Sequence, residues 1–143
     1  MDIKIKKAPL KKRKVKPTDE SKLGFGKIFT DHMFTMKYKE GKGWHDAVIE
    51  PYHDLKMDPT AMCLHYGQEI FEGLKAYRGK DGSIYLFRPM ENIKRMNLSA
   101  ERLCMAHIDE DLFMEGMKKL VLLEKDWIPR GEGTSMYIRP TMI

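Results

Sequence analysis

The segment Gly79–Gly82, of sequence GKDG, limits the folds open to this chain more than any other feature. It separates two runs that mix aliphatic and aromatic residues, Leu74–Arg78 and Ser83–Pro89. Glycine adopts the positive backbone angles that a tight turn needs, so this arrangement is typical of a β-hairpin. The middle of the chain is therefore predicted to be antiparallel sheet.

Further strand signals lie on both sides of this hairpin. Phe34–Lys39 alternates apolar with polar side chains and enters a glycine-rich turn, and residues 44–59 form a second, irregular extended segment. In residues 64–79 (LHYGQEIFEGLKAYRG), glycine interrupts the helical spacing of the apolar residues, which predicts one or two helical turns and then a strand. The β-branched and aromatic residues of 134–143 predict a last strand.

Two amphipathic helices are predicted between the hairpin and the last strand. The first begins at Pro89, where a missing N–H costs nothing, and carries an apolar stripe of Ile93, Met96, Ala100, Leu103 and Cys104. The second follows Asp109, a typical N-cap residue, and ends by Pro129; its inner edge is predicted as Phe113, Met117, Leu120, Val121 and Glu124. Strands and helices without strict alternation predict an α+β fold, an antiparallel sheet flanked by two main helices.

Charge is concentrated at the amino terminus. Seven lysines and one arginine lie within residues 4–16, and the rest of the chain is slightly acidic although the net charge is +5. Residues 1–22 are thus predicted to be a basic, flexible arm, and the body carries no electrostatic signature of nucleic-acid binding. The run PLKKRKVKP resembles a nuclear-import signal, and a solvated basic terminus is the alternative interpretation.

The chain has the length of one domain, 143 residues, and only two cysteines, Cys63 and Cys104. They lack the spacing of a metal site or redox pair, and both are predicted to be buried free thiols in a reducing compartment. No apolar run reaches the length of a signal peptide or a membrane span. We therefore expect no metal and no membrane partner, and a location in the cytosol or in an organelle reached by a targeting segment outside this sequence.

Two arginines are candidates for anion binding. Ser135, Tyr137 and Arg139 share one face of the last strand, where a phenol beside a guanidinium suits a carboxylate. The alternative is an arginine at the sheet edge with its stem on apolar surface. Arg95, with Ser99 one turn away, is either an exposed helix charge or an anion ligand. His65 is either a proton carrier or structural.

Four stretches, taken together, resemble the branched-chain amino acid aminotransferases, which are pyridoxal-phosphate enzymes of the D-amino-acid-transaminase-like fold. They cover nearly everything after residue 22 and stand in the family's order: FGKIFTDHM (25–33), LHYGQEIFEGLKAYR (64–78), LFRPMENIKRMNLSAERLCM (86–105) and YIRPTMI (137–143). The resemblance implies that residues 23–143 are the smaller N-terminal domain of such an enzyme. The chain stops at Ile143 within an apolar strand, which we expect of the first part of a larger protein.

The resemblance also implies roles for individual residues. Arg95 matches the arginine that grips the cofactor phosphate, and Phe71 matches a wall of the side-chain pocket. Tyr66 matches a second wall that the family supplies from the neighbouring subunit. Tyr137 matches the tyrosine near the substrate α-carboxylate, Arg139 the arginine for the distal carboxylate of glutamate, and Phe25 is expected to reach the pocket too.

The residues of covalent catalysis are not among these. In the family, the lysine that holds the cofactor, the glutamate at the pyridine nitrogen and a glycine-rich turn lie further on, in a larger domain. We therefore assign no catalytic residue to this chain and expect it to be inactive alone. The parent activity is expected to transfer the amino group of leucine, isoleucine or valine to 2-oxoglutarate in a cytoplasmic homodimer that uses pyridoxal 5'-phosphate. The alternatives are a non-catalytic module that self-associates or binds a partner, and another transaminase or lyase of the same fold.

Overall fold

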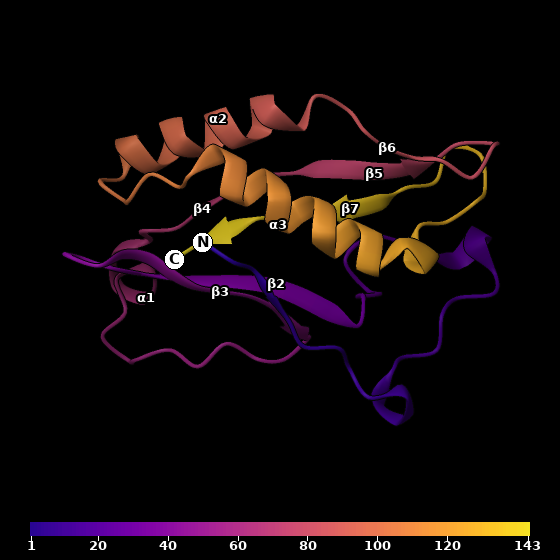
Figure 1. Cartoon of the computed structure of the whole chain (residues 1–143), viewed down its shortest axis with the longest axis horizontal. Coiled ribbons are helices and arrows are strands. Elements are labelled where there is room, and N and C mark those ends of the chain that lie inside the picture. Colours follow the sequence, from indigo (N-terminus) through magenta and orange to yellow (C-terminus); the bar gives the residue numbers. More distant parts are fainter.

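The computed structural model describes residues 1–143 and has three small sheets and two main helices. Figure 1 shows how they are arranged. The first sheet has the order β1-β3-β2, with β1 (Lys4–Ile5), β2 (His32–Lys39) and β3 (Gly43–Pro51). The predicted strand and the extended segment that follows its glycine turn are β2 and β3, which pair antiparallel, while β1 pairs with β3 in parallel. The α+β prediction is confirmed, although the sheet is divided.

The other two sheets come from the middle and the end of the chain. The predicted hairpin forms β5 (Leu74–Arg78) and β6 (Ile84–Leu86), and β7 (Met136–Ile138) pairs with the other side of β5. A two-stranded sheet joins β4 (Ile70–Phe71) to β8 (Thr141–Met142). Before them, α1 (Met62–Tyr66) is the predicted short helix, ended by Gly67 at a φ of 60°. The final strands thus lie beside the segment that contains Phe71.

The two long helices begin as their sequences predict. α2 (Pro89–Arg102) has proline in its first turn, and α3 (Glu110–Leu123) is capped by the Asp109 carboxylate, which accepts the Leu112 N–H at 2.7 Å. Short 3-10 turns are η1 (Leu10–Lys12), η2 (Glu20–Lys22) and η3 (Lys125–Trp127). No helix is both long enough and apolar enough to cross a bilayer.

Helix α3 separates two hydrophobic clusters, and Figure 1 shows it running between the α2 layer and β2–β3. Met117 and Val121 belong to the larger cluster, which also contains Ile93 and Met96 of α2. Leu112 faces the smaller cluster with Ile49 of β3. Packing is close on that side, because a Cβ added at Gly116 would lie 2.5 Å from the Phe34 ring.

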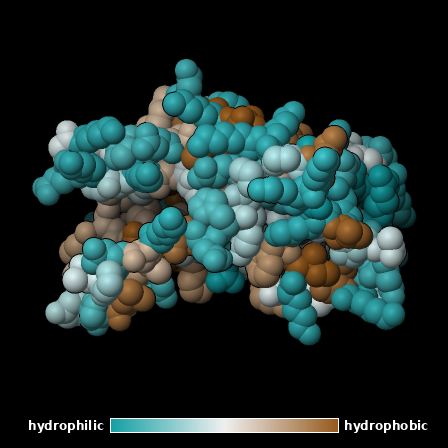
Figure 2. All heavy atoms as spheres, turned by 90° about the horizontal axis from the view of Figure 1, so that it is seen from below, coloured by the Kyte–Doolittle hydropathy of each residue, from teal (hydrophilic) through white to brown (hydrophobic).

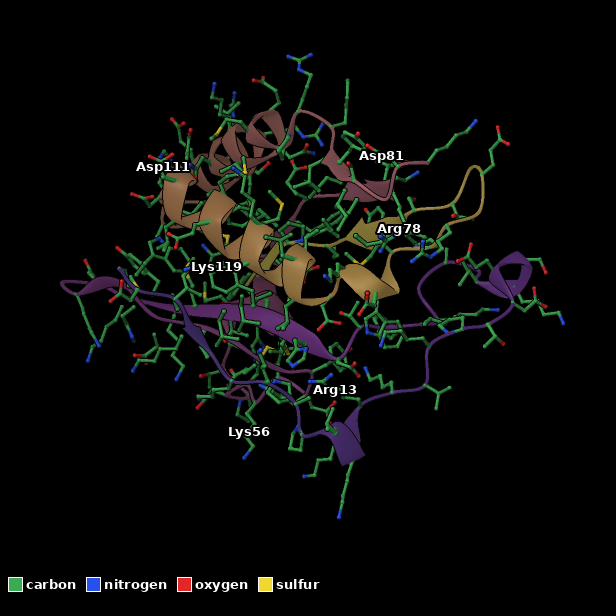
Figure 3. The ribbon with its side chains drawn as sticks, turned by 45° about the vertical axis from the view of Figure 1, so that its right-hand side comes forward. Arg13, Lys56, Arg78, Asp81, Asp111 and Lys119 are labelled. Atoms are coloured by element: carbon green, nitrogen blue, oxygen red, sulfur yellow. The ribbon has the colours of Figure 1, made fainter.

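The segment that follows α3 is bound to the hairpin by Arg78, which Figure 3 labels. Its Nε donates to the Ile128 carbonyl at 3.3 Å, and its Nη2 donates to the Lys125 carbonyl. Figure 3 also labels Asp81 in the β5–β6 turn, where its carboxylate accepts the Ser83 N–H at 3.0 Å. The turn that the sequence predicts is thus stabilised by its own aspartate.

The basic residues 1–22, predicted from sequence as a flexible arm, pack against the body along much of their length. Ile3 and Ala8 are buried, and the Ala8 N–H donates to Nε2 of His32 at 2.7 Å. Further along, the Lys14 N–H donates to Asp31 at 2.7 Å, and the Glu20 carboxylate accepts backbone N–H groups from the turn at residues 130–131. Most other side chains of the segment are exposed, including Leu10 and Val15, so the contacts rest on these two buried residues and on backbone hydrogen bonds.

The predicted apolar stripe of α2 is too long by one turn. Leu103 is 39% exposed and Cys104 is also exposed, because the helix ends at Arg102 and the chain turns back toward α3. Asn97 fixes this connection by exchanging two hydrogen bonds with the backbone of Ile108, at 2.8 and 3.0 Å. Cys63 is only half-buried, so the prediction of two buried thiols is wrong.

Candidate functional site

Four of the predicted site residues meet at one place on the surface. The guanidinium of Arg139 lies 4.3 Å from the centre of the Phe71 ring, and its Nη2 donates to the Tyr137 hydroxyl at 3.0 Å. The Phe25 ring contacts Tyr137 edge-on, with 5.0 Å between ring centres. A cation over an aromatic face is an attractive arrangement in water-exposed sites. The cluster therefore combines three aromatic rings with one cation.

Strand pairing explains why residues so distant in sequence meet. Ile138 pairs with Leu74 in the sheet of β5, and Thr141 pairs with Phe71 in the sheet of β4. Arg139 therefore lies where the chain passes from the β5 sheet to the β4 sheet. Gly73 allows the close approach of Tyr137, because an added Cβ would lie 2.0 Å from the Tyr137 hydroxyl oxygen. The glycine of the segment IFEGL thus has a steric role beside the cluster.

The cluster is open to solvent. Phe25 is 70% exposed and Phe71 is 60% exposed, whereas Tyr137 is half-buried between Gly73 and the Phe25 ring. Arg139 uses one nitrogen for Tyr137, which leaves further N–H donors for a ligand. This surface suits a ligand that has an aliphatic part for the rings and a carboxylate for the arginine.

Arg95 forms a second centre on α2. Its Nε donates to Oε1 of Glu72 at 2.6 Å and its Nη2 donates to Oε2 at 2.8 Å, so the pair is bidentate. Asn92, one turn earlier, donates to the same carboxylate at 2.9 Å. The guanidinium lowers the pKa of Glu72 from its ordinary value, and Glu72 raises the pKa of Arg95. The Glu72 side chain is buried while that of Arg95 is 67% exposed.

A shallow hollow adjoins this pair and is lined by Phe87, Arg88, Glu91, Asn92 and Arg95. Each guanidinium at the hollow has a carboxylate partner, Glu91 for Arg88 at 4.0 Å and Glu72 for Arg95, so an anion would bind there through the remaining N–H donors of the arginines and not through an excess of positive charge. Of the predicted neighbours, Ser99 makes no hydrogen bond to Arg95. The structure therefore puts Arg95 in a buried-carboxylate pair that the sequence did not indicate.

Two candidates lie apart from these centres. Tyr66 ends α1 with 78% of its surface exposed and makes no ring contact or hydrogen bond with the cluster. His65 contacts the Pro59 carbonyl through Nε2 at 2.6 Å, which favours the structural interpretation of this histidine. No group of three or more His, Cys, Asp or Glu side chains is arranged to hold a metal ion.

Sequence reasoning missed Glu72, Asn92 and Gly73. A signal existed for Glu72, because a charged residue in the otherwise apolar run Ile70–Leu74 must either face solvent or find a buried partner. Because side chains alternate along a strand, Glu72 lies on the face opposite to that of Phe71, the face that packs against the helices.

Comparisons with known proteins bear on both centres. The chain is 56% identical over 131 residues to branched-chain-amino-acid aminotransferase 2 of Bacillus subtilis, which covers 92% of this chain and 36% of that protein. It is 47% identical over 128 residues to the branched-chain-amino-acid aminotransferase of Dictyostelium discoideum, covering 90% of this chain and 34% of that one. This chain is homologous to branched-chain aminotransferases. It spans about a third of the length of these relatives.

The fold agrees with this relationship. A crystal structure of the Escherichia coli branched-chain amino acid aminotransferase superposes with a TM-score of 0.53 at 26% identity, covering 65% of this chain and 29% of that one. No protein-family model matches the chain. The homology to branched-chain aminotransferases therefore rests on the individual relatives and on the solved structure.

Proposed function

We propose that this chain supplies the substrate side-chain pocket and the phosphate-binding arginine of a pyridoxal-phosphate-dependent branched-chain aminotransferase. The observation that carries the proposal is the meeting of Phe25, Phe71, Tyr137 and Arg139. Such an enzyme must accept a branched aliphatic side chain and a glutamate side chain in one pocket. Aromatic walls with a guanidinium at the rim meet both needs.

Each residue of the cluster has a defined task in this proposal. The rings of Phe25 and Phe71 exclude water from the aliphatic side chain of leucine, isoleucine or valine. The Tyr137 hydroxyl binds the α-carboxylate that all substrates share. Arg139, held 3.0 Å from that hydroxyl, receives the distal carboxylate of glutamate or 2-oxoglutarate. In this proposal, Tyr137 binds the α-carboxylate that both substrates have, and Arg139 binds the distal carboxylate that only glutamate and 2-oxoglutarate have.

The donors of Arg95 fit the phosphate of the cofactor. Arginine has five N–H donors and Glu72 uses two of them, so three are left for phosphate oxygens at the hollow that also contains Arg88. Pyridoxal phosphate, when bound, supplies an electron sink for breaking the bond to the α-hydrogen. The lysine that holds it is expected in a larger domain following residues 23–143, and no lysine of this chain is assigned to that role.

A chimera tests the proposal. This chain replaces the matching 131 residues of the Bacillus subtilis enzyme, and glutamate formation from leucine and 2-oxoglutarate is measured with added cofactor. We expect activity within about tenfold of the parent, whereas this chain alone should form no glutamate because covalent catalysis needs the missing lysine. A folded chimera that binds cofactor and is inactive on all three branched-chain amino acids would contradict the proposal.

We also propose that the chain acts within a cytoplasmic homodimer. α1 buries none of its residues, and Leu64 and Tyr66 on it are largely exposed, as apolar side chains at a subunit contact would be. Figure 2 shows such apolar side chains as separate patches among polar ones on the underside. The two free thiols suit a reducing compartment. Sedimentation should find dimers at tens of micromolar, and a strict monomer would favour a non-associating fragment.

A further inference from the structure

Glu72 is a buried carboxylate at the junction of β4 and β5, with 4% of its surface exposed. It accepts two hydrogen bonds from Arg95, one from Asn92 and one from the Gly73 N–H at 3.3 Å. Four donors satisfy most of the lone pairs of an ionised carboxyl group, so the charge is stable there. Three of the four come from side chains of α2.

The backbone around Glu72 also contacts the aromatic cluster. The Glu72 N–H donates to the Pro140 carbonyl at 2.9 Å, directly after Arg139. Asn92 donates to the Gly73 carbonyl at 3.3 Å, and Gly73 lies against the Tyr137 hydroxyl. Residues 72 and 73 therefore contact the helix that carries Arg95 on one side and the strand that carries Tyr137 on the other.

We propose that Glu72 is a positioning residue that fixes the plane of the Arg95 guanidinium, so that its three free N–H groups form one preorganised face for a phosphate-type oxyanion. The inference rests on the proposed function for the identity of the anion. Through Gly73 and Pro140, the same residue sets the distance between that face and the Tyr137–Arg139 pocket.

Two effects of Glu72 on anion binding have opposite signs. Its negative charge weakens the attraction of Arg95 for an anion. Its bidentate contact removes rotamer freedom from a side chain that is 67% exposed and would otherwise have to be ordered by the ligand. In this proposal, the gain from holding the Arg95 guanidinium in place is larger than the loss from the negative charge of Glu72. Loss of the carboxylate therefore lowers the affinity for phosphate.

The test uses the full 143-residue chain labelled with ¹⁵N, and follows hydrogen exchange at the arginine Nε–H groups. We expect Arg95 to give a slowly exchanging Nε–H signal that disappears in Arg95→Lys. In Glu72→Gln this signal should exchange at least about tenfold faster. Arg78 is the internal control, because its Nε bonds to the Ile128 carbonyl and should be unchanged in every folded variant.

Inorganic phosphate is then titrated while the Arg95 signal is followed. Glu72→Gln should weaken binding about fivefold or more. Glu72→Asp keeps the charge but withdraws the carboxylate by one methylene, so it should lose slow exchange too, and it serves if Glu72→Gln loses the Arg78 signal and is unfolded. Unchanged Arg95 exchange, or equal or tighter phosphate binding in a folded variant, would overturn the proposal. If the Arg95 Nε–H of the wild type exchanges slowly only when Glu72 is present, but its signal does not change on addition of phosphate, then Glu72 orients Arg95 and the assignment of Arg95 to the cofactor phosphate is wrong.

Discussion

Replacing His32 by alanine is expected to remove a large part of the stability of this chain. His32 is 4% exposed, and its two ring nitrogens have different partners. Nε2 accepts the Ala8 N–H at 2.7 Å, so the ring proton is on Nδ1 and is donated to Glu124, which is 2% exposed. The ring therefore joins the amino-terminal segment to the end of α3.

The magnitude follows from the groups that the substitution leaves behind. Glu124 would keep only the Asp31 N–H, at 3.2 Å, as a partner for a buried charge. Because Nδ1 donates and Nε2 accepts, the contact with Glu124 is a hydrogen bond to a carboxylate and not a pair of opposite charges, and such a bond contributes about 1.5 to 3 kcal/mol. A buried unpaired amide such as that of Ala8 costs about 1 to 3 kcal/mol, but water can reach it once the segment loosens, so we expect a total of about 2 to 3 kcal/mol.

The assay is equilibrium unfolding in urea, followed by the fluorescence of the two tryptophans; one of them, Trp127, donates its indole N–H to Asp31 at 3.3 Å. Small domains have only about 5 to 15 kcal/mol of stability, so the midpoint should fall strongly. Lys119→Ala is the control, because its pair with Glu115 lies on the surface and should change stability by less than about 0.5 kcal/mol. A loss below about 1 kcal/mol in His32→Ala would refute the reasoning.

Three further predictions concern the two centres. In the chimera, Arg139→Met should slow the single-turnover reaction of glutamate about ten- to a hundredfold and slow that of leucine far less. Tyr137→Phe should slow the reactions of both substrates. Equal losses for glutamate and leucine in Arg139→Met would refute the separate roles of Tyr137 and Arg139. The folded-state pKa of Glu72 lies below its ordinary value of 4.5, so the ionised carboxylate stabilises the fold fully above pH 4.5 and this contribution is lost as the pH falls through the folded-state pKa. In Glu72→Gln, the free energy of unfolding from urea titrations should therefore fall less steeply as the pH is lowered. Gly73→Ala should displace the Tyr137 ring and cost about 1 to 3 kcal/mol, and a crystal structure with Tyr137 unmoved would contradict it.

The sequence predicted those elements whose signals are local. The GKDG turn, the Asp109 cap and the proline at the start of α2 each depend on a few neighbouring residues, and all three are present. Motif order also indicated which aromatic and cationic residues belong together. Strand pairing then brings Phe71, Tyr137 and Arg139 into contact across more than sixty residues of sequence, a placement that no single-sequence pattern specifies.

The features that local patterns do not predict have a different origin. The lysine-rich segment, predicted as a flexible arm, also contacts His32, Asp31 and β3 through backbone groups, and these partners lie in other parts of the chain. Likewise, helical spacing continues through Leu103 although the chain must turn before α3. Glu72 was overlooked because its role depends on Arg95, a partner 23 residues later on α2. Non-local contacts of this kind leave little trace in local composition.

The position of α3 between two clusters has a consequence for how the protein is made. β2 and β3 are complete at residue 51, but the helix that covers Phe34 and Ile49 begins at residue 110. At a translation rate of roughly 5 to 20 residues per second, residues 52–109 take roughly 3 to 12 s to synthesise. During that interval the apolar face of the nascent hairpin, with Phe34 and Ile49, has no helix to cover it. Dependence on chaperones should therefore be greatest while the central third of the chain is being synthesised, and should end when α3 has left the ribosome.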